Sequence, residues 1–114
     1  MKNLKNQVRL IGNAGALPVL KTFENGQSNV RFSLATNDYY KDKKGETQTT
    51  TEWHNIVAWG KTAELIAKLV TKGSELAIEG RLSSRSYEDK EGNTRYITEV
   101  IVNEFMLLGA KKAA

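Results

Sequence analysis

Two tryptophans, Trp53 and Trp59, are six residues apart in a segment that alternates between apolar and polar side chains. Successive side chains of a β-strand point to opposite faces, so this even spacing places both indole rings on one face. The opposite face then offers Ile56 and Ala58 to a hydrophobic core. A purely structural role inside the core is the ordinary alternative for two tryptophans in a β domain.

Two tyrosines lie among basic residues rather than among aliphatic ones. Tyr40 precedes a lysine-rich segment, and Tyr87 shares its strand parity with Arg81 and Arg85. An unpaired base presents a π-face whatever its identity, and its phosphate presents a negative charge. Flat rings interleaved with cations therefore favour the binding of single-stranded nucleic acid without reading of its sequence.

The residues that most catalytic and metal sites need are scarce. The chain has no cysteine and one histidine, His54, which excludes thiolate sites and multi-histidine metal sites. No nucleophile motif or acidic partner accompanies His54 at a diagnostic spacing, so a general-base role is disfavoured. Glu52, Glu79 and Glu99 are single carboxylates on separate strands, where pairing with arginine is more common than a nuclease site. We therefore expect no catalytic residue, no metal site and no cofactor.

Length and charge narrow the possibilities further. At 114 residues the chain fits one domain. Lysine and arginine number 17 against 13 aspartate and glutamate residues, which gives a net charge of +4 and favours polyanionic partners. The N-terminal residues lack the apolar run of a secretory signal, and no segment is long and apolar enough to cross a bilayer. A cytoplasmic or nucleoid-associated location, without a membrane partner, is the default expectation.

Alternating segments between turn signals predict a chain that is mostly β-strand. The expected strands cover residues 7–12, 29–36, 52–59, 75–82 and 95–108. A further stretch at 19–23 runs into Asn25-Gly26, a sequence typical of a two-residue type I′ hairpin turn. The polar segment 37–51 is predicted to be a long mobile loop. Residues 61–70 repeat apolar side chains at helical spacing, and a protruding arm with its tip at 89–93 is expected between the last two strands.

The order of these elements is typical of one all-β architecture. It predicts a five-stranded Greek-key OB-fold barrel with one short helix between strands three and four. We expect residues 1–108 to form this domain, and residues 109–114 to form a short polar tail.

A series of short motifs runs through the chain in a fixed order. From the N-terminus they are Val8-Arg9-Leu10-Ile11-Gly12-Asn13 with Pro18, Ser33-Leu34-Ala35-Thr36, Thr51-Glu52-Trp53-His54, Trp59-Gly60-Lys61, Lys72-Gly73-Ser74, Ile78-Glu79-Gly80-Arg81-Leu82 and Tyr96-Ile97-Thr98-Glu99-Val100. This series resembles the bacterial and mitochondrial single-stranded DNA-binding protein family over nearly the whole chain. Thr-Glu-Trp-His followed by an aromatic residue, glycine and lysine is its most specific part.

The resemblance implies a homotetramer of OB folds with single-stranded DNA wrapped over the outer surface and stacked on aromatic side chains. By position, the stacking residues are Tyr40, Trp53, Trp59 and Tyr87. Positions that approach phosphates in the family are occupied by Lys43, Lys61, Lys72 and Arg85. His54 matches a position near the subunit interface. Asn55 stands where a basic residue is frequent, which removes one expected charge.

The implied function is sequence-tolerant binding of single-stranded DNA, which protects and organises exposed strands in DNA replication, recombination and repair. Family members commonly end in an acidic tip that recruits replication and repair enzymes, whereas this sequence ends in Lys111-Lys112-Ala113-Ala114. Recruitment through such a tip is therefore not expected. A primosomal or RNA-binding OB-fold protein is the main alternative, and a small nuclease and a purely structural oligomeric barrel are two others.

Overall fold

The computed structural model describes residues 5–108, so the polar tail expected at 109–114 lies outside the described residues. The elements in chain order are β1 (Val8–Ala14), β2 (Lys21–Thr22), β3 (Ser28–Lys41), β4 (Thr47–Trp59), α1 (Gly60–Leu69), β5 (Glu75–Glu88) and β6 (Thr94–Leu107).

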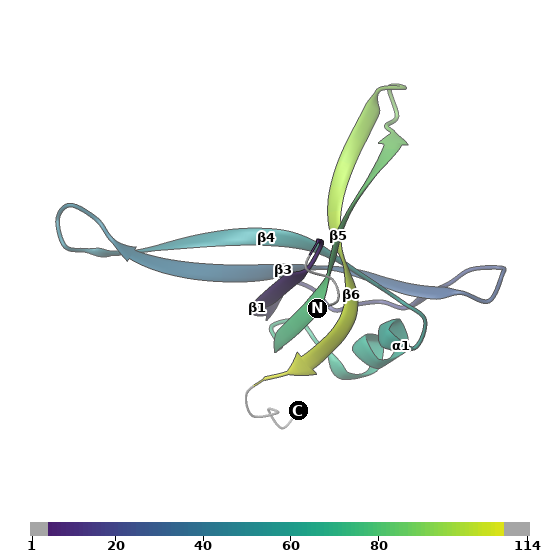
Figure 1. The fold of residues 1–114 in the computed structure, drawn as a ribbon, viewed down its shortest axis with the longest axis horizontal. Helices are drawn as coiled ribbons and strands as arrows, with labels where there is room; N and C mark the ends of the chain where they lie inside the picture. Colours follow the sequence, from purple (N-terminus) through teal and green to yellow (C-terminus); the bar gives the residue numbers. More distant parts are fainter. Residues whose placement is uncertain (1–4, 109–114) are drawn as a thin grey trace.

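The sheet closes on itself. Its strand order is β1-β5-β6-β4-β3-β2, and β1 also pairs with β3. Five strands, β1, β3, β4, β5 and β6, therefore form a barrel (Figure 1). The two-residue β2 pairs with β3 as an addition to it. The helix α1 follows β4 and precedes β5, so it stands between the third and fourth barrel strands. The predicted five-stranded OB barrel with one helix is confirmed.

Alternate residues of the barrel strands fill its interior, as the period-2 pattern predicted. Val30, Phe32 and Leu34 of β3 are buried, and so are Ile56 and Ala58 of β4. Helix α1 contributes the buried side chains of Ala63 and Ile66 to the same core. Neither the length nor the hydropathy of α1, the single helix among residues 5–108, would let it span a membrane.

The prediction of a long mobile loop at 37–51 is wrong. Strand β3 continues to Lys41 and β4 begins at Thr47, and the two pair without a register shift from Lys41↔Thr47 to Asn29↔Trp59. Polarity showed that this segment is not in the core, but it does not prevent pairing, because each strand satisfies the backbone groups of the other. Threonines between 47 and 51 are β-branched and suit a strand.

Two long hairpin arms thus leave the barrel in different directions (Figure 1). The first is the outer part of β3–β4, and the second is the outer part of β5–β6, which pair up to Glu88↔Thr94. The second arm and its tip at 89–93 are confirmed as predicted.

All three hairpin tips share one turn geometry. Gly26 N–H donates to the carbonyl oxygen of Phe23, and Phe23 N–H donates to that of Gln27, which encloses three residues with Gly26 at a φ of 84°. The type I′ turn expected at Asn25-Gly26 is therefore wrong. The same pair of backbone bonds recurs in the two arms, where the glycines at positive φ are Gly45 and Gly92.

An aspartate begins the turn of each arm. The Asp42 carboxylate accepts hydrogen bonds from the Gln48 side chain and from the backbone N–H groups of Glu46 and Lys44, and these donors lower the pKa of Asp42. Asp89 accepts from Arg95 first and from backbone N–H groups second, so its pKa is lowered in the same way.

Two glycines allow the barrel strands to approach closely. A Cβ at Gly12 would overlap the carbonyl oxygen of Ala35, and a Cβ at Gly80 would overlap that of Ile101. Gly80 also follows the register shift between β5 and β6. The absence of a side chain at these two positions lets the strands curve into a closed barrel. In that barrel β3, β4, β6 and β5 follow one another around the outer surface.

Candidate nucleic-acid interface

Trp53 and Trp59 lie on the outer face of β4. Their exposed fractions are 62% and 41%, whereas Ile56 and Ala58 on the inner face are almost fully buried. The alternative that both tryptophans are core residues is therefore wrong. At a rise of about 3.3 Å per residue, the two rings stand roughly 20 Å apart along the strand.

The Trp53 ring lies against Gly15, the residue that follows β1. A Cβ at Gly15 would be 2.6 Å from Cζ3 of Trp53 and 2.5 Å from Oγ of Ser33. The absent side chain thus lets the ring lie close to the backbone of the β1–β2 connection. The outer face of β4 from Trp53 to Trp59 forms a platform. Gly73 N–H donates to the carbonyl oxygen of Ala14 at 2.8 Å, which brings the loop that carries Lys72 to the Trp53 end of this platform.

The Trp59 ring has an aromatic neighbour that the sequence analysis missed. Phe23 stacks on Trp59 with ring centroids 6.0 Å apart and an interplanar angle of 27°. The Lys21 ammonium lies 5.2 Å from the Phe23 ring centroid. The sequence feature that could have pointed to Phe23 is its period-2 spacing from Lys21, just before a hairpin turn. Lys61 follows Trp59 by two residues, in the first turn of α1.

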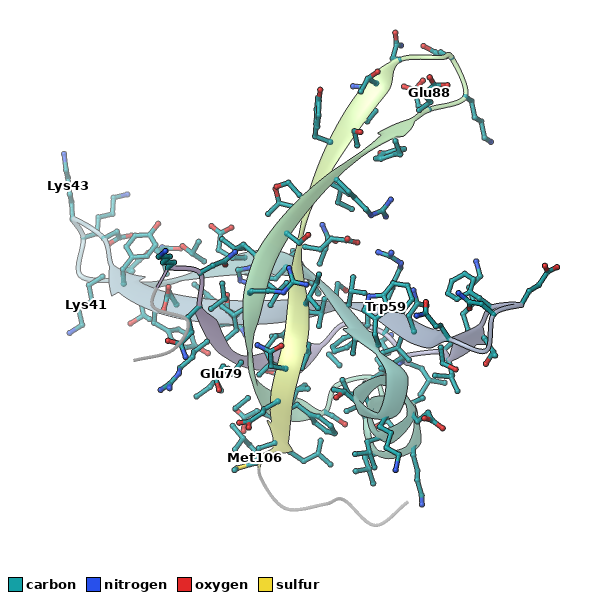
Figure 2. The ribbon with its side chains drawn as sticks, turned by 45° about the vertical axis from the view of Figure 1, so that its right-hand side comes forward. Lys41, Lys43, Trp59, Glu79, Glu88 and Met106 are labelled. Carbon is teal, nitrogen blue, oxygen red and sulfur yellow. The ribbon has the colours of Figure 1, made fainter. Side chains whose placement is uncertain are left out.

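The β3–β4 arm carries two exposed tyrosines on opposite faces. The register pairs Tyr39 with Thr49, so Tyr39 shares the face of Trp53, while Tyr40 pairs with Gln48 on the other face. Their exposed fractions are 70% and 55%. The sequence pattern had indicated only Tyr40 as a stacking residue on this arm. Lys43 lies at the far end of this arm, where its side chain and that of Lys41 point in opposite directions (Figure 2).

The β5–β6 arm carries Tyr87, which is half exposed. The Arg85 guanidinium lies 6.0 Å from the Tyr87 ring centroid, and its Nε forms an ion pair with Oε1 of Glu99 at 3.1 Å. Arg85 is therefore already engaged with a carboxylate. Glu99 also pairs with Arg31 of β3, a basic residue that the sequence analysis did not single out.

His54 and Asn55 have local partners. The Nε2 atom of His54 is 2.9 Å from Oγ1 of Thr36, and the register places His54 on the face opposite Trp53. The Asn55 amide Nδ2 lies 3.4 Å from the carbonyl oxygen of Thr98, which links β4 to β6 on the outer face.

Within residues 5–108, histidine, aspartate and glutamate side chains do not gather in any group of three that could hold a metal ion. The chemistry of the outer face is instead that of exposed rings and cations. Trp53 and Trp59 present π-faces. Lys72 lies toward the Trp53 end of this face, and Lys61 lies toward the Trp59 end. Such a surface can stack unpaired bases and neutralise their phosphates.

Comparisons with known proteins agree with this geometry. The chain matches the model of the Single-strand binding protein family over residues 5–108. It is 46% identical over 107 residues to Single-stranded DNA-binding protein 1 of Chlorobaculum tepidum, and this match covers 93% of the chain and 66% of that relative. It is 44% identical to Single-stranded DNA-binding protein 1 of Xylella fastidiosa, with 94% of the chain and 79% of the relative covered.

A solved structure is also similar. The Plasmodium falciparum SSB in complex with ssDNA superposes with a TM-score of 0.81 at 31% identity, covering 91% of this chain and 95% of the other. Taken together with the family match over residues 5–108, these similarities show that the chain belongs to the Single-strand binding protein family.

Proposed function

We propose that this chain binds single-stranded DNA with little dependence on base sequence, and thereby protects and organises exposed strands during DNA replication, recombination and repair. The observation that carries the proposal is the outer face of β4, where Trp53 and Trp59 are exposed by 62% and 41% among basic residues. The names of the relatives and the ssDNA complex of the similar structure support the choice of DNA as the ligand.

The proposed mechanism combines stacking with phosphate contacts. The proposed stacking residues are Trp53 and Trp59 on the outer face of β4, Tyr87 on the second arm, and Tyr40, which a strand would reach on the opposite face of the first arm. The proposed phosphate contacts are Lys43, Lys61, Lys72 and Arg85. Alanine substitutions in single-strand-binding proteins, OB folds among them, put base–aromatic stacking at roughly 1–3 kcal/mol per base. Ordering a flexible strand offsets part of that gain. No bond is made or broken in this process, so the proposed activity is binding without catalysis.

Several copies of the domain would combine their faces, and we propose a homotetramer. Strand β1 pairs with β5 from Val8 to Asn13 but with β3 only at Asn13 and Ala14, so most of one edge of β1 is open to another strand. Ile11 and Met106 are more than 60% exposed beside an open concavity of about 350 Å³ formed by β1, β5 and β6. Both features suit association with a second copy.

His54 is proposed to lie near the subunit interface, because it sits on the face of β4 opposite Trp53 and Trp59. Light scattering on the wild type and on His54→Ala tests this role. We expect a four-chain particle for the wild type and a smaller mean mass for the variant. An unchanged particle would contradict the role of His54. Acting on DNA, the protein is proposed to work in the cytoplasm at the nucleoid.

A fluorescence titration tests the binding function. Oligo-dT added at low salt should quench the emission of Trp53 and Trp59, because bases stack on their rings. A duplex of equal length should bind much more weakly, since its bases are already paired. Absence of quenching, or equal affinity for duplex, would refute the proposal. An RNA of equal length separates the alternative, because a preference for RNA requires contacts to 2′-hydroxyl groups.

A further inference from the structure

A buried carboxylate lies in the middle of the proposed strand-binding face. Glu99 of β6 is 6% exposed. The parallel pairing of β4 with β6 at Ile56↔Val100 and Val57↔Ile101 places Glu99 beside Asn55, on the same outer face as the two tryptophans. A negative charge is an unexpected feature of a surface that would attract phosphates.

Two arginines approach this carboxylate from opposite sides. Arg31 comes from β3 and its Nη1 pairs with Oε2 of Glu99, while Arg85 comes from β5 and its Nε pairs with Oε1. Because β4 lies between β3 and β6 in the sheet, the Arg31 side chain must pass over β4 to reach Glu99. It passes beside Val57, its register partner, and Val57 is only 2% exposed on this otherwise open face.

The two guanidiniums remain available to a ligand. The side chains of Arg31 and Arg85 are 44% and 46% accessible although both are paired. A guanidinium has five N–H donors, so one carboxylate contact leaves several donors free. A guanidinium held in one orientation also loses less freedom when it binds a phosphate. Glu99 cancels one charge, but the three groups together keep a net charge of +1 and a fixed geometry.

The position of Arg31 determines what it can bind. Its register partner Val57 is two residues from Trp59 and four from Trp53, so Arg31 lies between the two rings. A strand with bases stacked on both rings must carry its connecting phosphates across this part of β4. We propose that Arg31 is a phosphate-binding residue at the centre of the platform and that Glu99 is its positioning residue. This inference rests on the proposed function and adds a contact to it.

The experiment compares oligo-dT affinity over a range of salt concentrations. Arg31→Gln should bind about tenfold more weakly at low salt, as expected for the loss of a hydrogen bond to a charged group. The slope of log affinity against log salt should fall by about 0.7, the value for one phosphate contact on a single strand. Arg31→Lys should keep the slope and bind with intermediate affinity, because it retains the charge without the planar fork.

The variant Glu99→Gln distinguishes a positioning role of Glu99 from a simple effect of its negative charge on DNA binding. Removal of a negative charge would by itself tighten the binding of DNA, whereas loss of the positioning contact should weaken binding with the salt slope unchanged. Arg31→Lys retains the charge opposite Glu99, so it remains informative if thermal melting shows that Glu99→Gln destabilises the fold. The double variant Arg31→Gln/Asn55→Arg should regain the salt dependence of binding that Arg31→Gln loses, since residue 55 lies on the same face one strand away.

Lys68→Gln is the matched control. Lys68 is exposed in the last turn of α1, outside the outer face of β4 and outside the proposed contact surface of β1, so its loss removes one charge without touching the platform. Equal slope changes for Lys68→Gln and Arg31→Gln, or tighter binding by Glu99→Gln, would overturn the inference. Equal oligo-dT affinities of the wild type and Arg31→Gln would also overturn it. A wild type that does not bind would overturn the proposed function itself, and this inference with it.

Discussion

Replacement of Gly15 by alanine would displace Trp53 without removing it. The new Cβ would lie 2.6 Å from Cζ3 of the Trp53 ring, whereas carbon atoms in contact are normally about 3.5–4.0 Å apart. The ring must therefore retreat by about 1 Å, and the Ser33 hydroxyl, 2.5 Å from the same Cβ, must rotate away. Because Trp53 is 62% exposed, it can move into solvent.

The fold should tolerate this change. Gly15 is outside the group of described glycines with positive φ, and alanine at a compatible position stabilises by about 0.4–1 kcal/mol through the unfolded chain. That gain offsets the cost of moving the ring, so we expect the free energy of unfolding to change by about 1 kcal/mol or less. Circular dichroism should show a melting temperature within about 4–8 °C of the wild type.

Binding should change more than stability. A base stacked on Trp53 contributes roughly 1–3 kcal/mol, so complete loss of this stack in Trp53→Ala would weaken oligo-dT binding by about 5- to 140-fold. We expect Gly15→Ala to show part of this loss. In the background of Trp53→Ala it should have no further effect, since both changes act through the same ring.

The double-mutant cycle supplies the refutation. If Gly15→Ala weakens binding equally with and without the Trp53 ring, then Gly15 does not act through Trp53. Ser33→Ala is the control, because it removes the other group in contact with the new Cβ and leaves the ring in place. Its affinity for oligo-dT should match that of the wild type.

Three further changes have outcomes that the structure predicts. Gly80→Ala should destabilise the barrel by about 1–3 kcal/mol and lower its melting temperature accordingly, because its Cβ overlaps the Ile101 carbonyl oxygen; a wild-type melting curve would contradict this close approach. Hydrogen bonds, chiefly from Arg95, lower the pKa of Asp89, so these bonds stabilise the turn above pH 3.8 and are lost as the pH falls through the lower folded pKa. Amide protection at the turn, relative to that of the barrel strands, should therefore decrease as the pH falls below 3.8, whereas in Asp89→Asn it should not change over this range; the same pH dependence in both proteins would argue against it. Lys43→Gln at the tip of the first arm should reduce the salt slope of oligo-dT binding by about 0.7, and an unaltered slope would exclude a phosphate contact.

Local spacing was enough to predict most of the barrel. The alternation of Val30, Phe32 and Leu34 marked the inner face of one strand, and the helical spacing at 61–70 marked the helix within one residue of its bounds, Gly60–Leu69. The same spacing put Trp53 and Trp59 on one outer face, where they are exposed. These predictions succeeded because the direction of a side chain in a strand or helix repeats over a few residues.

The polar segment at 37–51 shows the limit of hydropathy. Its composition correctly indicated that it is not in the core, but it forms most of a hairpin arm from β3 to β4. Backbone pairing depends on the partner strand rather than on burial of either face, so hydropathy does not report it. Once the arm is known to be a strand pair, its register places Tyr39 rather than Tyr40 on the face of Trp53.

Local patterns of side chains were therefore sufficient to predict the strand periodicity, the helix and the aromatic residues of β4. Which distant side chains meet on the outer face depends on the folded arrangement of the strands: Phe23 lies against Trp59, and Arg31 and Arg85 pair with Glu99. Arg31 and Glu99 are 68 residues apart in the chain. They meet because parallel pairing of β4 with β6 and closure of the barrel set the lateral order and register of the strands, and neither of these is a property of any local stretch of sequence.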